Sequence, residues 1–130
     1  MMDTDWLKKL GKVYRTDGND IYIKTDAKDI ASAIKTLKDK KTSHITAITG
    51  IDMKKNMEII YHFWLEKHMI NIKTTISRET PKIMTITKEF PGALLFEMEL
   101  AEMLGVKVEG IGEEHLLLAE DSAVYPLRRD

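Results

Sequence analysis

The protein of 130 residues contains no cysteine. Iron–sulfur clusters are held mainly by cysteine thiolates, and cysteine-type zinc sites and redox dithiols need thiolates outright. The protein therefore cannot supply the ligands for these sites. It also has no disulfide framework, and its first residues, MMDTDWLKK, lack the basic and then apolar profile of a secretory signal. These absences predict a cytoplasmic protein.

Long apolar runs and a strong net charge are lacking as well. The longest stretch without Asp, Glu, Lys or Arg is Thr42–Ile51, about half of the ~20 residues that a membrane-spanning helix needs. Lys and Arg number 20 against 21 Asp and Glu, so no general attraction draws the protein to nucleic acid or to anionic lipid. We therefore expect neither a membrane span nor a nucleic-acid partner.

The hydrophobic spacing predicts an α+β fold with a mainly antiparallel meander and two main helices packed on it. One helix is expected from Asp26 to Leu37 and a second from Pro91 to Leu104, ended by Gly105. Three β-rich runs joined by short polar linkers lie at His44–Ile51, Met57–Leu65 and Ile70–Ser77. Shorter elements are a helix at Thr4–Leu10, strands at Ile21–Lys24 and Val106–Glu109, and a connection at Arg78–Phe90 with at most one helical turn.

The middle β-rich run has no polar face. Alternate residues point the same way in a strand, which groups Ile59, Tyr61 and Phe63 on one face and Ile60, His62 and Trp64 on the other. A strand that is apolar on both faces is typically covered on both. We therefore expect this strand to be central and covered on both sides.

The length of the sequence suits one domain. We expect a single α+β domain over residues 1–121, followed by an extended, irregular tail over residues 122–130.

No motif of catalysis or cofactor binding stands out. Gly110-Ile111-Gly112 imitates the start of a dinucleotide fingerprint, but the third glycine position is His115 and no helix of useful length follows. The four histidines, His44, His62, His68 and His115, lack the spacing of three or four residues that brings ligands together on a helix. We therefore expect no catalytic residue, no bound metal and no cofactor.

Glu97 is the unusual residue of the second helix. On a helical wheel it lies among four apolar residues, Ala93, Leu100, Ala101 and Leu104. A buried carboxylate needs a partner. In one interpretation Glu97 is peripheral or reaches a nearby backbone N–H or an Arg; in the other it pairs with Arg128 or Arg129, or with a basic group of another protein.

The last third of the sequence resembles a known family. Glu97–Val106, followed by Glu109-Gly110, resembles the E-R-E-x-x-D-h-h-G-I … x-G signature of the C subunit of respiratory complex I, and Tyr125–Asp130 resembles the H-P-L-R-K-D ending of that family. Ile59–Phe63 is similar to its central strand, and Pro81–Ala93 to its approach to the signature helix. The resemblance spans about residues 20 to 130.

Within this resemblance, the sequence is most similar to a shorter form. Met98, Glu102 and Leu104 stand where the complex I proteins have Arg, Asp and Phe, and the sequence ends at the P-L-R-R-D element. Such short forms resemble the small hydrophilic subunit of membrane-bound, energy-converting NiFe hydrogenases.

The resemblance implies a scaffold without a cofactor. In the family this subunit lies in the cytoplasmic arm beside the catalytic large subunit and the Fe–S subunits, and those partners carry out electron transfer and ion translocation. The resemblance implies a role at the partner interface, or in shaping it, for the matched residues Glu97, Glu99, Glu102, Gly105, Gly110, Tyr125, Pro126, Leu127, Arg128 and Arg129.

Two alternatives remain from the residues alone. A free-standing module that binds a small ligand should have a closed pocket with convergent polar groups, whereas a subunit should have a broad apolar patch. A small hydrolase or metal enzyme would need His62 and Glu97 to lie within hydrogen-bond reach of one another.

Overall fold

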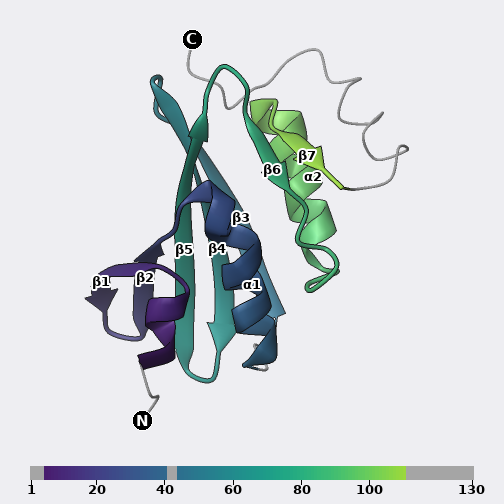
Figure 1. Ribbon diagram of the computed structural model, residues 1–130. Helices are drawn as coiled ribbons and strands as arrows, with labels where there is room; N and C mark the ends of the chain where they lie inside the picture. The colour runs from purple at the N-terminus through teal and green to yellow at the C-terminus, as the bar shows by residue number, and fades with distance from the viewer. Residues whose placement is uncertain (1–4, 41–43, 111–130) are drawn as a thin grey trace.

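The structure is a computed structural model that describes residues 5–40 and 44–110. Its main sheet has five strands in the order β1-β2-β5-β4-β3 (Figure 1). The strands are β1 (Lys12–Asp17), β2 (Asp20–Lys24), β3 (His44–Asp52), β4 (Asn56–Leu65) and β5 (His68–Ser77). β2 and β5 pair in parallel and all other neighbours are antiparallel. The predicted α+β class and the β3-β4-β5 meander are confirmed.

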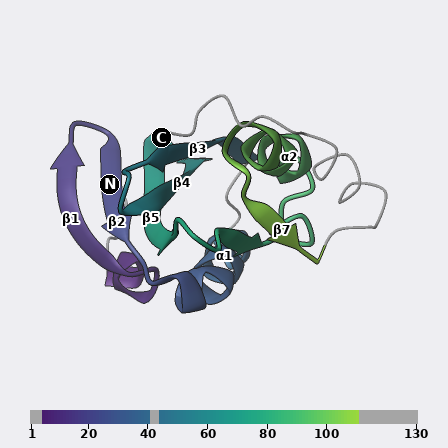
Figure 2. The ribbon, with the colours of Figure 1, turned by 90° about the horizontal axis from the view of Figure 1, so that it is seen from above.

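Two helices and a small second sheet complete the described fold. The elements are the 3₁₀ turns η1 (Asp5–Lys9) and η2 (Ala27–Asp29), the helices α1 (Ile30–Asp39) and α2 (Ala93–Leu104), and the strands β6 (Lys82–Met84) and β7 (Lys107–Glu109). β6 and β7 pair in parallel and lie between the two helices (Figure 2).

The ends of α2 follow from its sequence. Gly105 adopts a left-handed conformation with φ 76°, and its N–H donates to the carbonyl of Ala101 at 3.0 Å, as glycine commonly does after the last helical residue. The helix begins at Ala93, two residues later than predicted, because Pro91 and Gly92 form a preceding turn. The single helical turn expected before it is present, since the Phe90 N–H donates to the Ile86 carbonyl.

The core lies on one face of the main sheet. On β4 every second residue is buried, namely Met57, Ile59, Tyr61, Phe63 and Leu65. The Phe63 ring packs against Phe90, with ring centroids 5.0 Å apart. A bulge between Ile45 and Ala47 turns both Ile45 and Ile48 of β3 toward this face. One layer of apolar side chains therefore joins the sheet to both helices.

The other face of β4 corrects our expectation. Ile60 and His62 are half-buried and Trp64 is 37% exposed, and no helix or strand of the described residues lies over them. The prediction of a strand covered on both sides is therefore wrong for the described part of the protein. The reason is that both helices pack against the same face of the sheet.

Strands β1 and β6 were not predicted. All residues of β1 are exposed, so its sequence shows no alternation of apolar and polar residues. β6 is only three residues long and pairs with β7, which lies more than twenty positions further along the sequence. The formation of each strand depends on pairing with a partner strand, so neither is marked by a pattern in its own sequence.

Gly50 allows α2 to approach β3, and this predicts a destabilising substitution. A Cβ atom at Gly50 would lie 2.4 Å from Leu104 Cδ1 and 2.6 Å from Leu100 Cδ2. Gly50→Ala should therefore lower the free energy of unfolding by about 1–3 kcal/mol, measured by urea denaturation. Gly92→Ala is the matched control, since its Cβ would meet only Ile45 Cγ2 at 4.0 Å. Equal stability of the two variants would contradict this close packing.

Candidate functional site

Glu97 is fully buried and accepts two hydrogen bonds. Its Oε1 accepts from the Thr85 hydroxyl at 2.6 Å, and its Oε2 accepts from the backbone N–H of Ile86 at 2.7 Å. Both donors lie just after β6, in the connection that leads to α2. The carboxylate therefore fastens this connection to the second turn of α2.

Thr85 links this carboxylate to the small sheet. Its backbone N–H donates to the carbonyl of Glu109 at the end of β7, at 2.8 Å, while its hydroxyl donates to Glu97 and accepts from the Thr87 N–H at 3.2 Å. One residue thus joins β6, β7 and α2.

Burial changes the acidity of the groups around Glu97. Removal from water raises the pKa of Glu97 above its ordinary value near 4.5, and the hydrogen bonds from Thr85 and Ile86 partly oppose the rise. Burial also raises the pKa of Tyr61, and the nearby Glu97 charge raises it further. The Tyr61 hydroxyl therefore remains protonated and can donate a hydrogen bond throughout the physiological pH range.

The uncovered face of the main sheet is rich in aromatic residues. We call it the open face and define it by Tyr14, Tyr22, Ile60, His62, Trp64 and Lys73. The Tyr14 and Tyr22 rings lie 6.2 Å apart, and Lys73 Nζ lies 4.7 Å from the Tyr14 ring centroid and 3.5 Å from Glu58 Oε2. Reasoning from the sequence did not find Tyr14, because β1 was not predicted.

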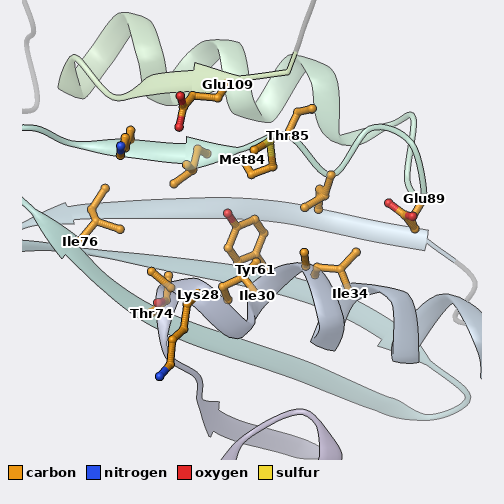
Figure 3. Close-up of a pocket in the computed structure, with 15 residues that line it drawn as sticks. Lys28, Ile30, Ile34, Tyr61, Thr74, Ile76, Met84, Thr85, Glu89 and Glu109 are labelled. Atoms are coloured by element: carbon orange, nitrogen blue, oxygen red, sulfur yellow. The ribbon is translucent and has the colours of Figure 1, made fainter.

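A cavity of about 400 Å³ lies between the core face of the sheet, α1 and β6 (Figure 3). Five isoleucines are among its lining residues, and Tyr61 and Thr74 line it from the sheet. Among the lining residues, Tyr61 lies on β4, the strand whose sequence has no polar face.

Comparison with known proteins identifies the family. Residues 23–130 match the family model described as the respiratory-chain NADH dehydrogenase, 30 Kd subunit. The chain belongs to this family.

Two curated relatives illustrate the range of the family. The C subunit of the NADH-quinone oxidoreductase of Roseiflexus castenholzii is 26% identical over 108 residues, which cover 78% of this chain and 62% of the relative. The C subunit of the F(420)H(2) dehydrogenase of Methanosarcina mazei is 24% identical over 113 residues, covering 82% of this chain and 70% of the relative. The match thus spans about three-fifths of the Roseiflexus protein.

A solved structure has the same fold. It belongs to the membrane-bound sulfane sulfur reductase, an archaeal respiratory membrane complex, and matches with a TM-score of 0.81 at 21% identity. The match covers 96% of this chain and 80% of that one. The family model that matches residues 23–130 confirms the resemblance to the C subunit family of respiratory complex I, and the finer resemblance to the hydrogenase branch stays a prediction.

The structure tests part of each interpretation of Glu97. The expected contact with a backbone N–H is confirmed by Ile86, whereas a peripheral position is wrong because the residue is 0% exposed. Arg128 and Arg129 lie outside the described residues, so their pairing with Glu97 stays a prediction.

The other matched residues do not converge on one point. Glu99 and Glu102 lie on the outer sides of α2, Gly105 ends that helix, and Gly110 follows β7 with φ 92°. The remaining matched residues, Tyr125, Pro126, Leu127, Arg128 and Arg129, lie outside the described part of the protein, as does the predicted tail over residues 122–130.

His62 and Glu97 lie on opposite faces of the sheet, so the hydrolase interpretation is wrong. His62 Nε2 lies 2.9 Å from the Thr49 hydroxyl and Nδ1 is paired with Asn71 Oδ1 on the open face, whereas Glu97 lies against the core face. Within residues 5–40 and 44–110, no three His, Asp or Glu side chains gather to hold a metal ion. In the same residues no helix is both long and apolar enough to cross a membrane.

The raised pKa of Glu97 predicts how stability depends on pH. The folded state holds the Glu97 proton more tightly than the unfolded state, so unfolding becomes easier as the pH rises from about 4.5 through the pKa of the folded state. E97Q stays neutral and should flatten the fall in unfolding free energy across this window.

The measurement is chemical denaturation at a series of pH values. Glu99→Gln, a change on the outer side of the same helix, should keep the wild-type slope. A slope that is unchanged in E97Q would contradict the raised pKa.

Proposed function

We propose that this protein is a non-catalytic structural subunit of the peripheral arm of a membrane-bound respiratory complex, where it lies beside the catalytic large subunit. The observation that carries the proposal is the family match over residues 23–130. The NADH-quinone oxidoreductase and F(420)H(2) dehydrogenase relatives are named as subunits of such enzymes. We propose a cytoplasmic location at the membrane, reached through partner subunits.

The described residues favour a scaffold over a catalyst. The buried carboxylate of Glu97 is taken up by donors of its own chain, Thr85 and Ile86. His62 is likewise bonded to Thr49 and Asn71. These contacts hold secondary-structure elements of the described residues together.

The open face supports the proposal that this protein is a subunit of a larger complex. Tyr14 is 44% exposed and Trp64 is 37% exposed, and both stand on the same side of the sheet as the half-buried Ile60. Aromatic residues are enriched at protein interfaces because they bury a large area and lose little conformational freedom. The proposal is that a neighbouring protein packs against this face of the sheet.

Within the family we propose the branch of the energy-converting NiFe hydrogenases. The support is the signature itself, in which Met98, Glu102 and Leu104 replace the Arg, Asp and Phe of the complex I proteins. The partners would then be a hydrogenase-type large subunit and neighbouring Fe–S subunits.

Purification of the tagged protein from native membranes tests both levels of the proposal. Recovery with a large subunit that has two C-x-x-C pairs supports the hydrogenase branch. A large subunit without these pairs would contradict that branch and keep the scaffold role. Recovery of the protein alone would overturn the scaffold role and favour a free-standing ligand-binding module.

The C-terminal residues are predicted to hold the protein in its complex. Deletion of residues 122–130 should leave the domain folded, as measured by circular dichroism, but should abolish co-purification of the large subunit. The expected reason is that an extended segment with Tyr125 and Leu127 satisfies its apolar and backbone groups best on a partner.

A charge-reversal pair separates this effect from a change in net charge. Arg128→Glu with Arg129→Glu should weaken co-purification, whereas Lys54→Glu with Lys55→Glu, at the exposed β3–β4 turn, should not. Undiminished recovery of the large subunit after the deletion would contradict the proposal that the C-terminal residues dock on a partner.

A further inference from the structure

The cavity between the sheet, α1 and β6 has the size and lining of a small-molecule site. Its volume is about 400 Å³, which is within the range of ligand pockets, about 300–1,000 Å³. Ile30 and Ile34 line it from α1, Ile76 from the sheet and Ile83 from β6. Three elements of one chain thus surround a mainly apolar space (Figure 3).

We call the side of the cavity that the main sheet forms its floor. This floor carries a buried hydroxyl group without a hydrogen-bond partner among the described residues. Thr74 is 2% exposed, and within the described residues its buried Oγ1 has no hydrogen-bond partner. Most buried polar groups in proteins are hydrogen-bonded, because an unmade bond costs free energy. A ligand that reaches the floor would supply the missing partner.

Tyr61 places a second hydroxyl in the same space. Its phenol oxygen points from β4 toward β6 (Figure 3), and Tyr61 and Thr74 stand on adjacent strands of the same core face. Hydroxyl groups donate and accept hydrogen bonds, so the floor suits either a carbonyl or a hydroxyl group of a ligand.

The charges around the floor favour a neutral ligand. Glu97 lies close enough to Tyr61 to affect its ionisation, and Glu97 is bonded to Thr85, which lines the opposite wall. The cationic residues of the lining, Lys28 and Lys82, lie toward solvent. An anionic group at the floor would therefore lose its hydration and face a buried acid without gaining a cation.

We propose that this cavity binds a mainly apolar small molecule that carries one neutral carbonyl or hydroxyl group, and that Thr74 donates a hydrogen bond to that group. The proposal is independent of the scaffold role, since the site is formed entirely by this chain. It accounts for both the mainly apolar space and the buried hydroxyl, whereas an apolar side chain of a partner would leave the Thr74 hydroxyl without a hydrogen bond.

A matched set of three probes tests the proposal on the full-length protein. Benzophenone has a neutral carbonyl, diphenylmethane lacks it, and diphenylacetate carries a negative charge. In titrations followed by amide NMR signals, benzophenone should shift the signals of Ile34, Thr74 and Ile83. It should bind about 2- to 10-fold more tightly than diphenylmethane and at least about tenfold more tightly than diphenylacetate.

Two variants locate the site and the hydrogen bond. Thr74→Val keeps the shape of the side chain and removes its hydroxyl, so benzophenone should lose its advantage over diphenylmethane while diphenylmethane still binds. Ala31→Trp, at an exposed position that lines the cavity, should block both probes. Lys35→Trp, at an exposed position of α1 outside the lining, is the matched control.

The outcomes separate clearly. No binding of any probe to the full-length protein would overturn the proposal. Shifts confined to the open face would also overturn it. An unchanged preference for benzophenone in Thr74→Val would refute the assigned hydrogen bond.

Discussion

The hydrogen bonds accepted by Glu97 hold together the half of the molecule that follows the meander. Without the bonds from Thr85 and Ile86, the segment after β6 would lose this polar link to α2. Ile83 and Ile86, which line the cavity, belong to this same part of the chain. A carboxylate in the core is tolerated only when its lone pairs are satisfied, so Glu97 ties the segment after β6 to the signature helix.

The second constraint is that both helices cover the same face of the sheet. Gly50 lets Leu100 and Leu104 of α2 approach β3, while α1 buries Ile30, Ala33, Ile34 and Leu37. The core is consequently a single layer, and the open face is left with aromatic side chains and a histidine bonded within the sheet. This one-sided architecture suits a protein that completes its burial within an assembly.

The signature residues of the family serve the fold in different ways. Glu97 anchors the segment after β6, Gly105 ends α2, and Gly110 adopts the positive φ that follows β7. Glu99 and Glu102 instead present their side chains on the outer sides of α2. The motif thus combines residues that hold the fold together with residues exposed on the surface of α2.

The sequence by itself determined the elements that have a strong local pattern. The β-rich composition of β4 and β5, the helical spacing before Leu37 and the glycine after α2 are decided by neighbours within a few positions, so those elements and the α+β class were predictable. The signature residues also revealed the family. The absence of cysteine excluded thiolate sites from composition alone.

Three features depend on the folded arrangement of the chain: the face of the sheet that each helix covers, the partner strands of β1 and β6, and the atoms that donate hydrogen bonds to Glu97. These features join residues far apart in the sequence: Tyr14 meets Lys73, and Thr74 meets a cavity whose other wall is β6. A pattern of residue types records whether a side chain prefers burial, but not which distant element buries it. The open face and the cavity therefore emerge only when the protein is folded.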